Sequence, residues 1–249
     1  VERDRMLFGE DSLYWRTRIL AEFPEQETGA LFSLKDLLEV QELERDPTQP
    51  VEAGFDPSSS RSESHSVIVF RQGPCAYRLE LIEASNLMQM AEKANQLLLQ
   101  EGAERVKVDA IGLAAGVADR LAELAGSFYE VLPVRGSEKS VAGYSNLRTE
   151  MWVKFAELVK KGQAGGPVFR DRRVIKDLLT IELEITPSGK LALSKKVTGR
   201  TQFDFGDALV YAFWNPGGVS ELREIVSPGL KPLVIPKTES PFRNYERPW

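Results

Sequence analysis

The chain has 249 residues, of which 28% are charged and 42% are hydrophobic, a composition that suits one large α/β domain with extensions. A single cysteine, Cys75, excludes an intramolecular disulfide and a cysteine-cluster metal site, and a single histidine, His65, argues against a histidine-rich zinc centre. Any metal ion would therefore be held by carboxylates. No apolar stretch reaches the length of a membrane-spanning helix, so we expect no membrane partner and a cytoplasmic location. The net charge of −5 argues against an overall basic nucleic-acid-binding surface, although a local one is compatible with it.

The first half of the chain predicts a helical lead-in followed by a meander of strands. Residues 1–50 are charged, have a helical pattern and end at a break with two prolines. Residues 51–55, 66–71 and 77–82 have the pattern of strands, the last two joined by a Gly-Pro turn. Because strands that are neighbours in sequence usually pair, we expect an antiparallel three-strand meander.

The middle of the chain alternates between helix and strand patterns. Ser85 is predicted to cap a helix that runs to Gln100 and is followed by a strand at 106–109, a helix at 117–124 and a strand at 129–133. Such alternation adds parallel strands to the meander. The predicted fold class is therefore α/β, with a mixed central sheet flanked by helices.

The last third of the chain predicts a further helix capped by Ser145, a glycine-rich loop at 162–168 and a hairpin formed by 181–185 and 191–193. An apolar helix begins at Asp204 or Gly206 and continues to Trp214. Residues 219–249 are proline-rich and lack periodicity. The predicted organisation is thus a lead-in at 1–50, one domain at 51–218 and an extended tail.

Acidic residues occur at three separate places where chemistry is expected. Asp56 ends the first predicted strand, Asp109 ends the fourth, and Asp204 and Asp207 open the last helix. Acids at the carboxyl ends of strands in open α/β sheets lie where ligands bind. Carboxylates brought together repel one another unless a cation neutralises them, and Mg²⁺ and Mn²⁺ prefer oxygen ligands. The pattern favours a metal-dependent hydrolysis of phosphodiesters by two ions.

Most of these acids also have an ordinary interpretation. Asp56 precedes a proline and suits a turn, while Glu63, a second candidate metal ligand, suits a solvated loop. Asp204 and Asp207 suit the first turn of a helix, where the macrodipole favours negative charge. The hypothesis of a metal site therefore depends on the joint arrangement of these residues.

Several stretches resemble, in order, the nuclease domain of viral terminase large subunits. They are 54–57 with Glu63, the Asp-Ala-Ile-Gly-Leu-Ala-Ala-Gly-Val-Ala-Asp-Arg-Leu run at 109–121, the Asn-Leu-Arg and Trp elements within 144–152, the Ser-Lys element within 193–196, and the Asp-Phe-Gly-Asp-Ala-Leu element within 203–209. The resemblance implies an RNase H-like fold and a two-metal endonuclease that uses Mg²⁺ or Mn²⁺ to cut double-stranded DNA during genome packaging. It further implies that Asp56 and Asp109 are catalytic metal ligands, with Asp204 as the third and Asp207 beside it as a further catalytic and metal-binding residue; which of Asp204 and Asp207 is the main third ligand stays open.

The same resemblance implies partners. The chain has no Gly-x-x-x-x-Gly-Lys-Ser/Thr motif, so it lacks the phosphate-binding loop of an ATP-driven translocase. We therefore expect the ATPase domain to belong to the same longer polypeptide, with the portal protein and the small terminase subunit as further partners in the host cytoplasm.

A basic stretch predicts where DNA binds. Residues 154–200 contain eleven Lys or Arg against five Asp or Glu. The residues expected to contact phosphates are Arg148, Arg170, Arg172, Arg173, Lys196 and Arg200, and Lys195 is expected to stabilise charge at the scissile phosphate. The stretch also suits a solvated basic face. No aromatic residues alternate with the basic ones, so cutting should be nearly independent of sequence.

Two other functions remain open from the sequence. The domain could be a DNA-gripping or docking module whose acids no longer catalyse, with the proline-rich tail binding another protein of the assembly. It could also be a junction resolvase of the same fold, which would cut branched DNA in preference to linear duplex.

Overall fold

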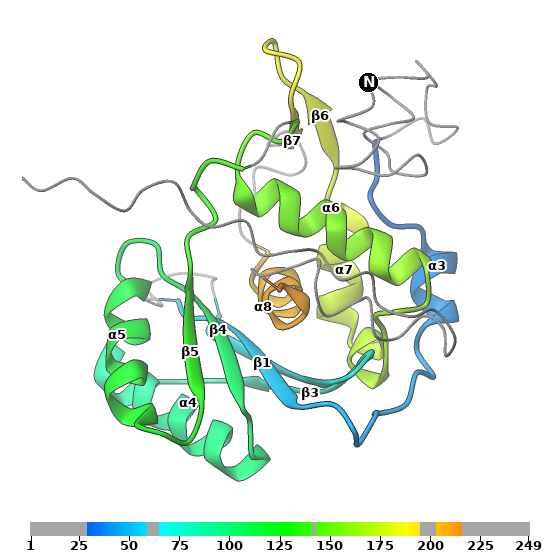
Figure 1. Cartoon of the computed structure of the whole chain (residues 1–249). Coiled ribbons are helices and arrows are strands. Elements are labelled where there is room, and N and C mark those ends of the chain that lie inside the picture. The colour runs from blue at the N-terminus through cyan, green and yellow to red at the C-terminus, as the bar shows by residue number, and fades with distance from the viewer. Residues whose placement is uncertain (1–28, 59–64, 141–142, 195–202, 216–249) are drawn as a thin grey trace, which may run out of the picture. The chain divides into compact units, whose positions relative to one another are not determined.

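A five-stranded mixed sheet forms the centre of the domain (Figure 1). The computed structural model describes residues 29–58, 65–140, 143–194 and 203–215. The strand order is β3-β2-β1-β4-β5, in which β1 pairs antiparallel with β2 and parallel with β4. The meander and its parallel extension are therefore as predicted. The strands are β1 (Val51–Asp56), β2 (Val67–Gln72), β3 (Cys75–Leu81), β4 (Arg105–Asp109) and β5 (Glu130–Val134).

Two helices, α4 (Leu87–Glu101) and α5 (Ala114–Ala125), cover one face of the sheet (Figure 1). The N-cap of α4 is Asn86, whose side chain accepts from the Gln89 N–H, and not Ser85 as predicted. The core between sheet and helices is apolar because alternate residues of each strand point the same way. Its strand residues include Ala53, Phe55, Ile68, Phe70, Val106 and Val108.

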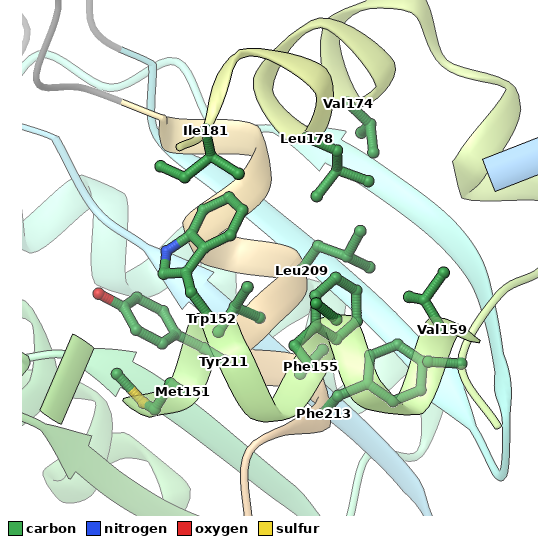
Figure 2. Close-up of a cluster of buried hydrophobic side chains, with 14 of the residues drawn as sticks. Met151, Trp152, Phe155, Val159, Val174, Leu178, Ile181, Leu209, Tyr211 and Phe213 are labelled. Atoms are coloured by element: carbon green, nitrogen blue, oxygen red, sulfur yellow. The ribbon is translucent and has the colours of Figure 1, made fainter. Parts of the chain in front are cut away.

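The opposite face of the sheet is covered by α8 (Asp204–Phe213), with α6 (Leu147–Lys160) and α7 (Arg172–Thr180) packed around that helix (Figure 1). Large side chains of these three helices interdigitate, as Figure 2 shows for Trp152, Phe155, Leu178, Leu209 and Phe213. The helix α7 was not predicted, and it follows a short 3-10 turn at Pro167–Arg170. The N-cap of α6 is Asn146 rather than Ser145, because the Asn146 side chain accepts from the Thr149 N–H.

The end of the predicted lead-in belongs to the same core. Leu31, Phe32, Leu37 and Val40, the last at the end of α3 (Leu34–Glu39), are all buried in the cluster around α6 and α8. The predicted hairpin is present as β6 (Leu183–Ile185) and β7 (Leu191–Leu193). No helix in the described ranges is long and apolar enough to cross a membrane.

Gly54 lets α8 lie directly on the sheet. It is in the middle of β1, and a Cβ atom there would be 2.1 Å from the Ala208 carbonyl oxygen and 2.2 Å from the Ala212 nitrogen. Glycine in a strand interior commonly marks a place where another backbone approaches closely. The neighbours of Gly54 on the same face, Glu52 and Asp56, therefore lie on either side of the helix crossing.

A buried ion network fixes the carboxyl end of α8. The Glu52 carboxylate accepts from Lys107 of β4 and from Arg71 of β2, the latter at 2.5 Å. Both cations also donate to the Ala212 carbonyl oxygen, Lys107 at 3.1 Å and Arg71 at 2.6 Å. Positive charge next to the last carbonyls of a helix stabilises it. The network thus joins three strands to one end of α8.

We predict that Gly54→Ala destabilises the domain by about 3 kcal/mol or more, because the methyl group meets backbone atoms of α8 that have no alternative position. Urea unfolding followed by circular dichroism measures the change. Gly116→Ala in α5 is the control, since its Cβ would meet only Leu87 at 3.9 Å, and it should stabilise by about 0.5–1 kcal/mol. Equal stability of the two variants would contradict the close approach.

Candidate active site

Three segments bring four acids to the carboxyl edge of the sheet. The parallel register pairs Phe55 of β1 with Val108 of β4, so that the next residues, Asp56 and Asp109, end neighbouring strands. The first turn of α8 supplies Asp204 and Asp207. The strand ends and the helix start predicted to carry the chemistry therefore meet.

The electrostatics show that these acids face one another. Burial raises the pKa of Asp56 well above its ordinary value, and the charges of Asp207, Asp109 and Asp204 raise it further. Burial, together with Asp207, raises the pKa of Asp109 to about 6. Burial is also the main cause that raises the pKa of Asp204. Burial and the neighbouring acids thus disfavour the negatively charged form of all three carboxyl groups.

Asp207 differs from the other acids because its oxygens are occupied. Arg148 donates to both of them, from Nε to Oδ1 at 2.9 Å and from Nη2 to Oδ2 at 2.6 Å. The Trp152 indole nitrogen also donates to Oδ1, at 2.8 Å. Such a bidentate pair is geometrically specific and strong. Asp207 therefore holds Arg148 in place. The Asp207 side chain is almost fully buried.

Arg148 supplies positive charge among the acids. Its charge lowers the pKa of Asp56, Asp109 and Asp204, against the larger effect of burial. Its side chain is 27% exposed, while its Nε and Nη2 atoms donate to the buried Asp207. The residue that the sequence suggested for DNA contact is thus an internal partner of the acidic cluster.

Asp204 retains acceptor capacity. Its Oδ2 accepts from the backbone N–H of His65 at 2.5 Å, which joins the start of the β2 segment to α8. The His65 ring packs against Phe205 with centroids 5.4 Å apart. Among the described residues, no hydrogen bond to the Asp204 Oδ1 atom occurs, so this oxygen is available to a ligand.

The donor set fits a hard divalent cation. Asp56, Asp109 and Asp204 offer carboxylate oxygens, and a cation would offset the burial and repulsion that raise their pKa values. As the side chains stand, no three acids of the described ranges already form a closed metal-binding group. Glu63 and Lys195 lie outside the described residues.

The basic residues near α7 are partly engaged in ion pairs. Arg170 pairs with Glu42, and Arg173 donates to Asp171, the N-cap of α7, at 2.6 Å. The Arg173 guanidinium lies 4.7 Å from the Phe205 ring centroid, next to Asp204 in sequence. Arg172 is exposed at the start of α7. The basic side of α7 thus adjoins the acids, while Lys196 and Arg200 lie outside the described residues.

Sequence reasoning missed one acid of this neighbourhood. Asp177 of α7 accepts from the backbone N–H groups of Phe205 and Gly206 at the start of α8. Burial, with Asp207 and Asp204, raises its pKa to about 6. The signal in the sequence was the apolar spacing of Val174 and Leu178, which predicts a helix over this segment.

Similar folds occur among solved structures. The nuclease domain of the large terminase subunit gp2 of bacterial virus Sf6 matches with a TM-score of 0.64 and 17% identity, over 75% of this chain and 99% of that one. The large terminase nuclease from thermophilic phage G20c with bound magnesium matches with a TM-score of 0.55 and 20% identity, over 76% of this chain and 97% of that one. The nuclease domain of the large terminase of Thermus phage P74-26 matches with a TM-score of 0.51 and 18% identity, over 74% of this chain and 94% of that one.

This chain has the RNase H-like fold of those nuclease domains. Mixed strand order, the helices on both faces and the additional hairpin agree with the predicted fold class. The Sf6 domain has also been solved with manganese and the G20c nuclease with magnesium and cobalt. No protein-family model and no curated protein matches the chain.

We predict that Asp109→Asn stabilises the metal-free protein, and more so at higher pH. A folded pKa of about 6 lies above the ordinary value for Asp, so the carboxyl contributes favourably below about pH 4 and this contribution is lost as the pH rises through 6. Asparagine keeps the acceptor for the Ile111 N–H. Thermal unfolding in EDTA should show a gain of about 1–3 kcal/mol at pH 8 and little at pH 4. The same substitution at the exposed Asp119 of α5 is the control, and a gain that did not change with pH would contradict the assignment.

Proposed function

We propose that this domain is a divalent-metal-dependent endonuclease that cuts double-stranded DNA during viral genome packaging. The observation that carries the proposal is the meeting of Asp56, Asp109 and Asp204, three buried or half-buried carboxylates whose pKa values are all raised. Such a cluster is costly unless it serves to bind a cation. The fold shared with terminase nuclease domains, some solved with magnesium or manganese, supports this choice.

In this proposal Asp56, Asp109 and Asp204 would hold two Mg²⁺ or Mn²⁺ ions. When bound, such ions activate water and stabilise the leaving oxygen of a phosphodiester. Asp56 and Asp109 are fixed by their strands, and Asp204 is oriented by the His65 N–H. Asp207 keeps Arg148 beside the carboxylates, where the positive charge of Arg148 would attract a phosphate. Glu63 and Lys195 remain candidates for a further ligand and for charge stabilisation.

The DNA would lie across the basic side of α7. Arg172 and Arg173 begin this helix, and Arg173 is placed beside Phe205 at the acids. We include Arg170, Lys196 and Arg200 in the same phosphate-binding surface, and contacts of this kind do not read sequence. The partners of the proposed function are the ATPase domain of the same polypeptide, the portal protein and the small terminase subunit, in the host cytoplasm.

We expect Asp109→Ala to reduce nicking of supercoiled plasmid in Mn²⁺ by about 100-fold or more, since removing a ligand removes the charge stabilisation that the ions supply. Asp119→Ala, ten residues later on the exposed side of α5, is the matched control and should nick like wild type. An Asp109→Ala variant that nicks at the wild-type rate would refute the assignment. Duplex binding without nicking by wild type would favour a docking module, and preference for branched DNA would favour a resolvase.

We expect the double substitution Arg172→Glu and Arg173→Glu to weaken duplex binding about tenfold or more at low salt. It should also make the slope of log affinity against log salt shallower by about one to two, because binding with fewer phosphate contacts releases fewer counterions from the DNA. Fluorescence anisotropy with a labelled duplex gives both quantities. Lys35→Glu on α3, a side chain 83% exposed, is the control. Unchanged affinity and slope in the double variant would place the DNA elsewhere.

A further inference from the structure

The helix that carries Asp204 lacks a cap of its own. Phe203 is the N-cap of α8 and makes no side-chain hydrogen bond to the first turn. The first N–H groups of a helix have no partner within the helix, and leaving them unpaired in a buried place is costly. Most of the residues of α8 are buried, so these groups need a partner from elsewhere in the fold.

Asp177 provides that partner from a different helix. Its Oδ2 atom accepts from the Phe205 N–H and from the Gly206 N–H, each at 3.1 Å. The two residues are 28 and 29 positions further along the chain, so this is a tertiary contact and not a local capping motif. A carboxylate at this position also interacts favourably with the positive end of the helix dipole.

Gly206 brings the two helices close enough for this contact. A Cβ atom on Gly206 would lie 2.4 Å from the Trp152 ring and 3.3 Å from the Asp177 Cβ. The start of α8 is therefore held between Trp152 of α6 and Asp177 of α7, where Figure 2 also shows Trp152 close to α8. The side chain of Trp152 in turn donates to Asp207, which fixes the same turn from the other side.

Asp177 occupies this place despite unfavourable neighbours. The charges of Asp207 and Asp204 oppose its ionisation, and burial opposes it more strongly. A carboxylate in such a position is costly for stability alone. The contact to α8 is the compensation that the structure shows.

We propose that Asp177 is a positioning residue, which places Asp204 for metal binding by capping the first turn of α8 from α7. Asp204 directly precedes the two residues whose N–H groups Asp177 accepts, so the cap sets the start of the helix on which Asp204 stands. The inference rests on the proposed function, since it concerns the affinity of that site for its cation. Outer partners that orient ligands commonly change metal affinity by about 10- to 100-fold.

The test compares Mn²⁺ binding, measured by electron paramagnetic resonance of the free ion, with the Mn²⁺ dependence of plasmid nicking. Asp177→Ala should bind Mn²⁺ about 10- to 100-fold more weakly than wild type and need a correspondingly higher Mn²⁺ concentration for half-maximal nicking. Asp177→Asn keeps an oxygen that can accept from both N–H groups, so its affinity should stay within about threefold of wild type. If the alanine variant does not fold, Asp177→Glu replaces it, and the displaced acceptor should weaken Mn²⁺ binding by about 3- to 10-fold.

Asn86→Ala is the matched control. It also removes a side-chain cap, at the start of α4 on the opposite face of the sheet, and so causes a similar loss of stability without touching α8. Its Mn²⁺ affinity should equal that of wild type.

The outcomes separate the two proposals. Wild-type affinity in Asp177→Ala, an equal weakening in Asn86→Ala, or an equal weakening in Asp177→Asn would each overturn the positioning role while leaving the metal site intact. No Mn²⁺ binding by wild type would instead refute the proposed function, and with it the role of Asp177.

Discussion

The direct contact of α8 with β1 at Gly54 is the constraint on which the rest of the structure depends. Only glycine admits the backbone of Ala208 and Ala212 at this distance, and the helix axis is thereby fixed against the middle of the sheet. The start of the helix then lies near a cluster of acids, and its end lies near an acid that is paired with cations. Asp56 lies towards the start of α8, while Glu52 and its cations lie towards the end. Gly54 thus determines where the two ends of α8 lie relative to the charged residues of β1.

The two ends of α8 are held by different physical means. Lys107 and Arg71 donate to its last turn, which is favourable because the cations complement the helix dipole and are neutralised by Glu52. At the first turn the acids repel one another, and Asp177 and the Arg148 to Asp207 pair provide the interactions that keep the turn in place. The cost of desolvating buried ion pairs of this type offsets much of their attraction, whereas removing one partner leaves an uncompensated buried charge. The last turn of α8, which accepts from two cations, therefore anchors the helix. The first turn, where the acids repel one another, carries the proposed chemistry.

The sequence was sufficient for the sheet and for the acids that end its strands, because period-two patterns and chain order determine both. The location of Asp56 and Asp109 followed directly from this. It was insufficient for the contacts of Asp207, since an i, i+3 pair at a helix start looks the same whether its members bind a metal or an arginine from another helix. Asp177 was missed for a similar reason: its acceptor role depends on the packing of α7 against α8, and no local pattern encodes packing between helices.

The chain order of these contacts has a consequence for biosynthesis. The hydrogen bond from Arg71 to the Ala212 carbonyl joins residues 141 positions apart, and α8 is the last element that the structure describes. Contacts of long sequence separation form late, because the intervening chain must first be ordered. During synthesis, β1 and β4 leave the ribosome long before the helix that completes the acidic cluster. The nascent domain therefore presents Asp56 and Asp109 without Asp204 until α8 has been synthesised and docks.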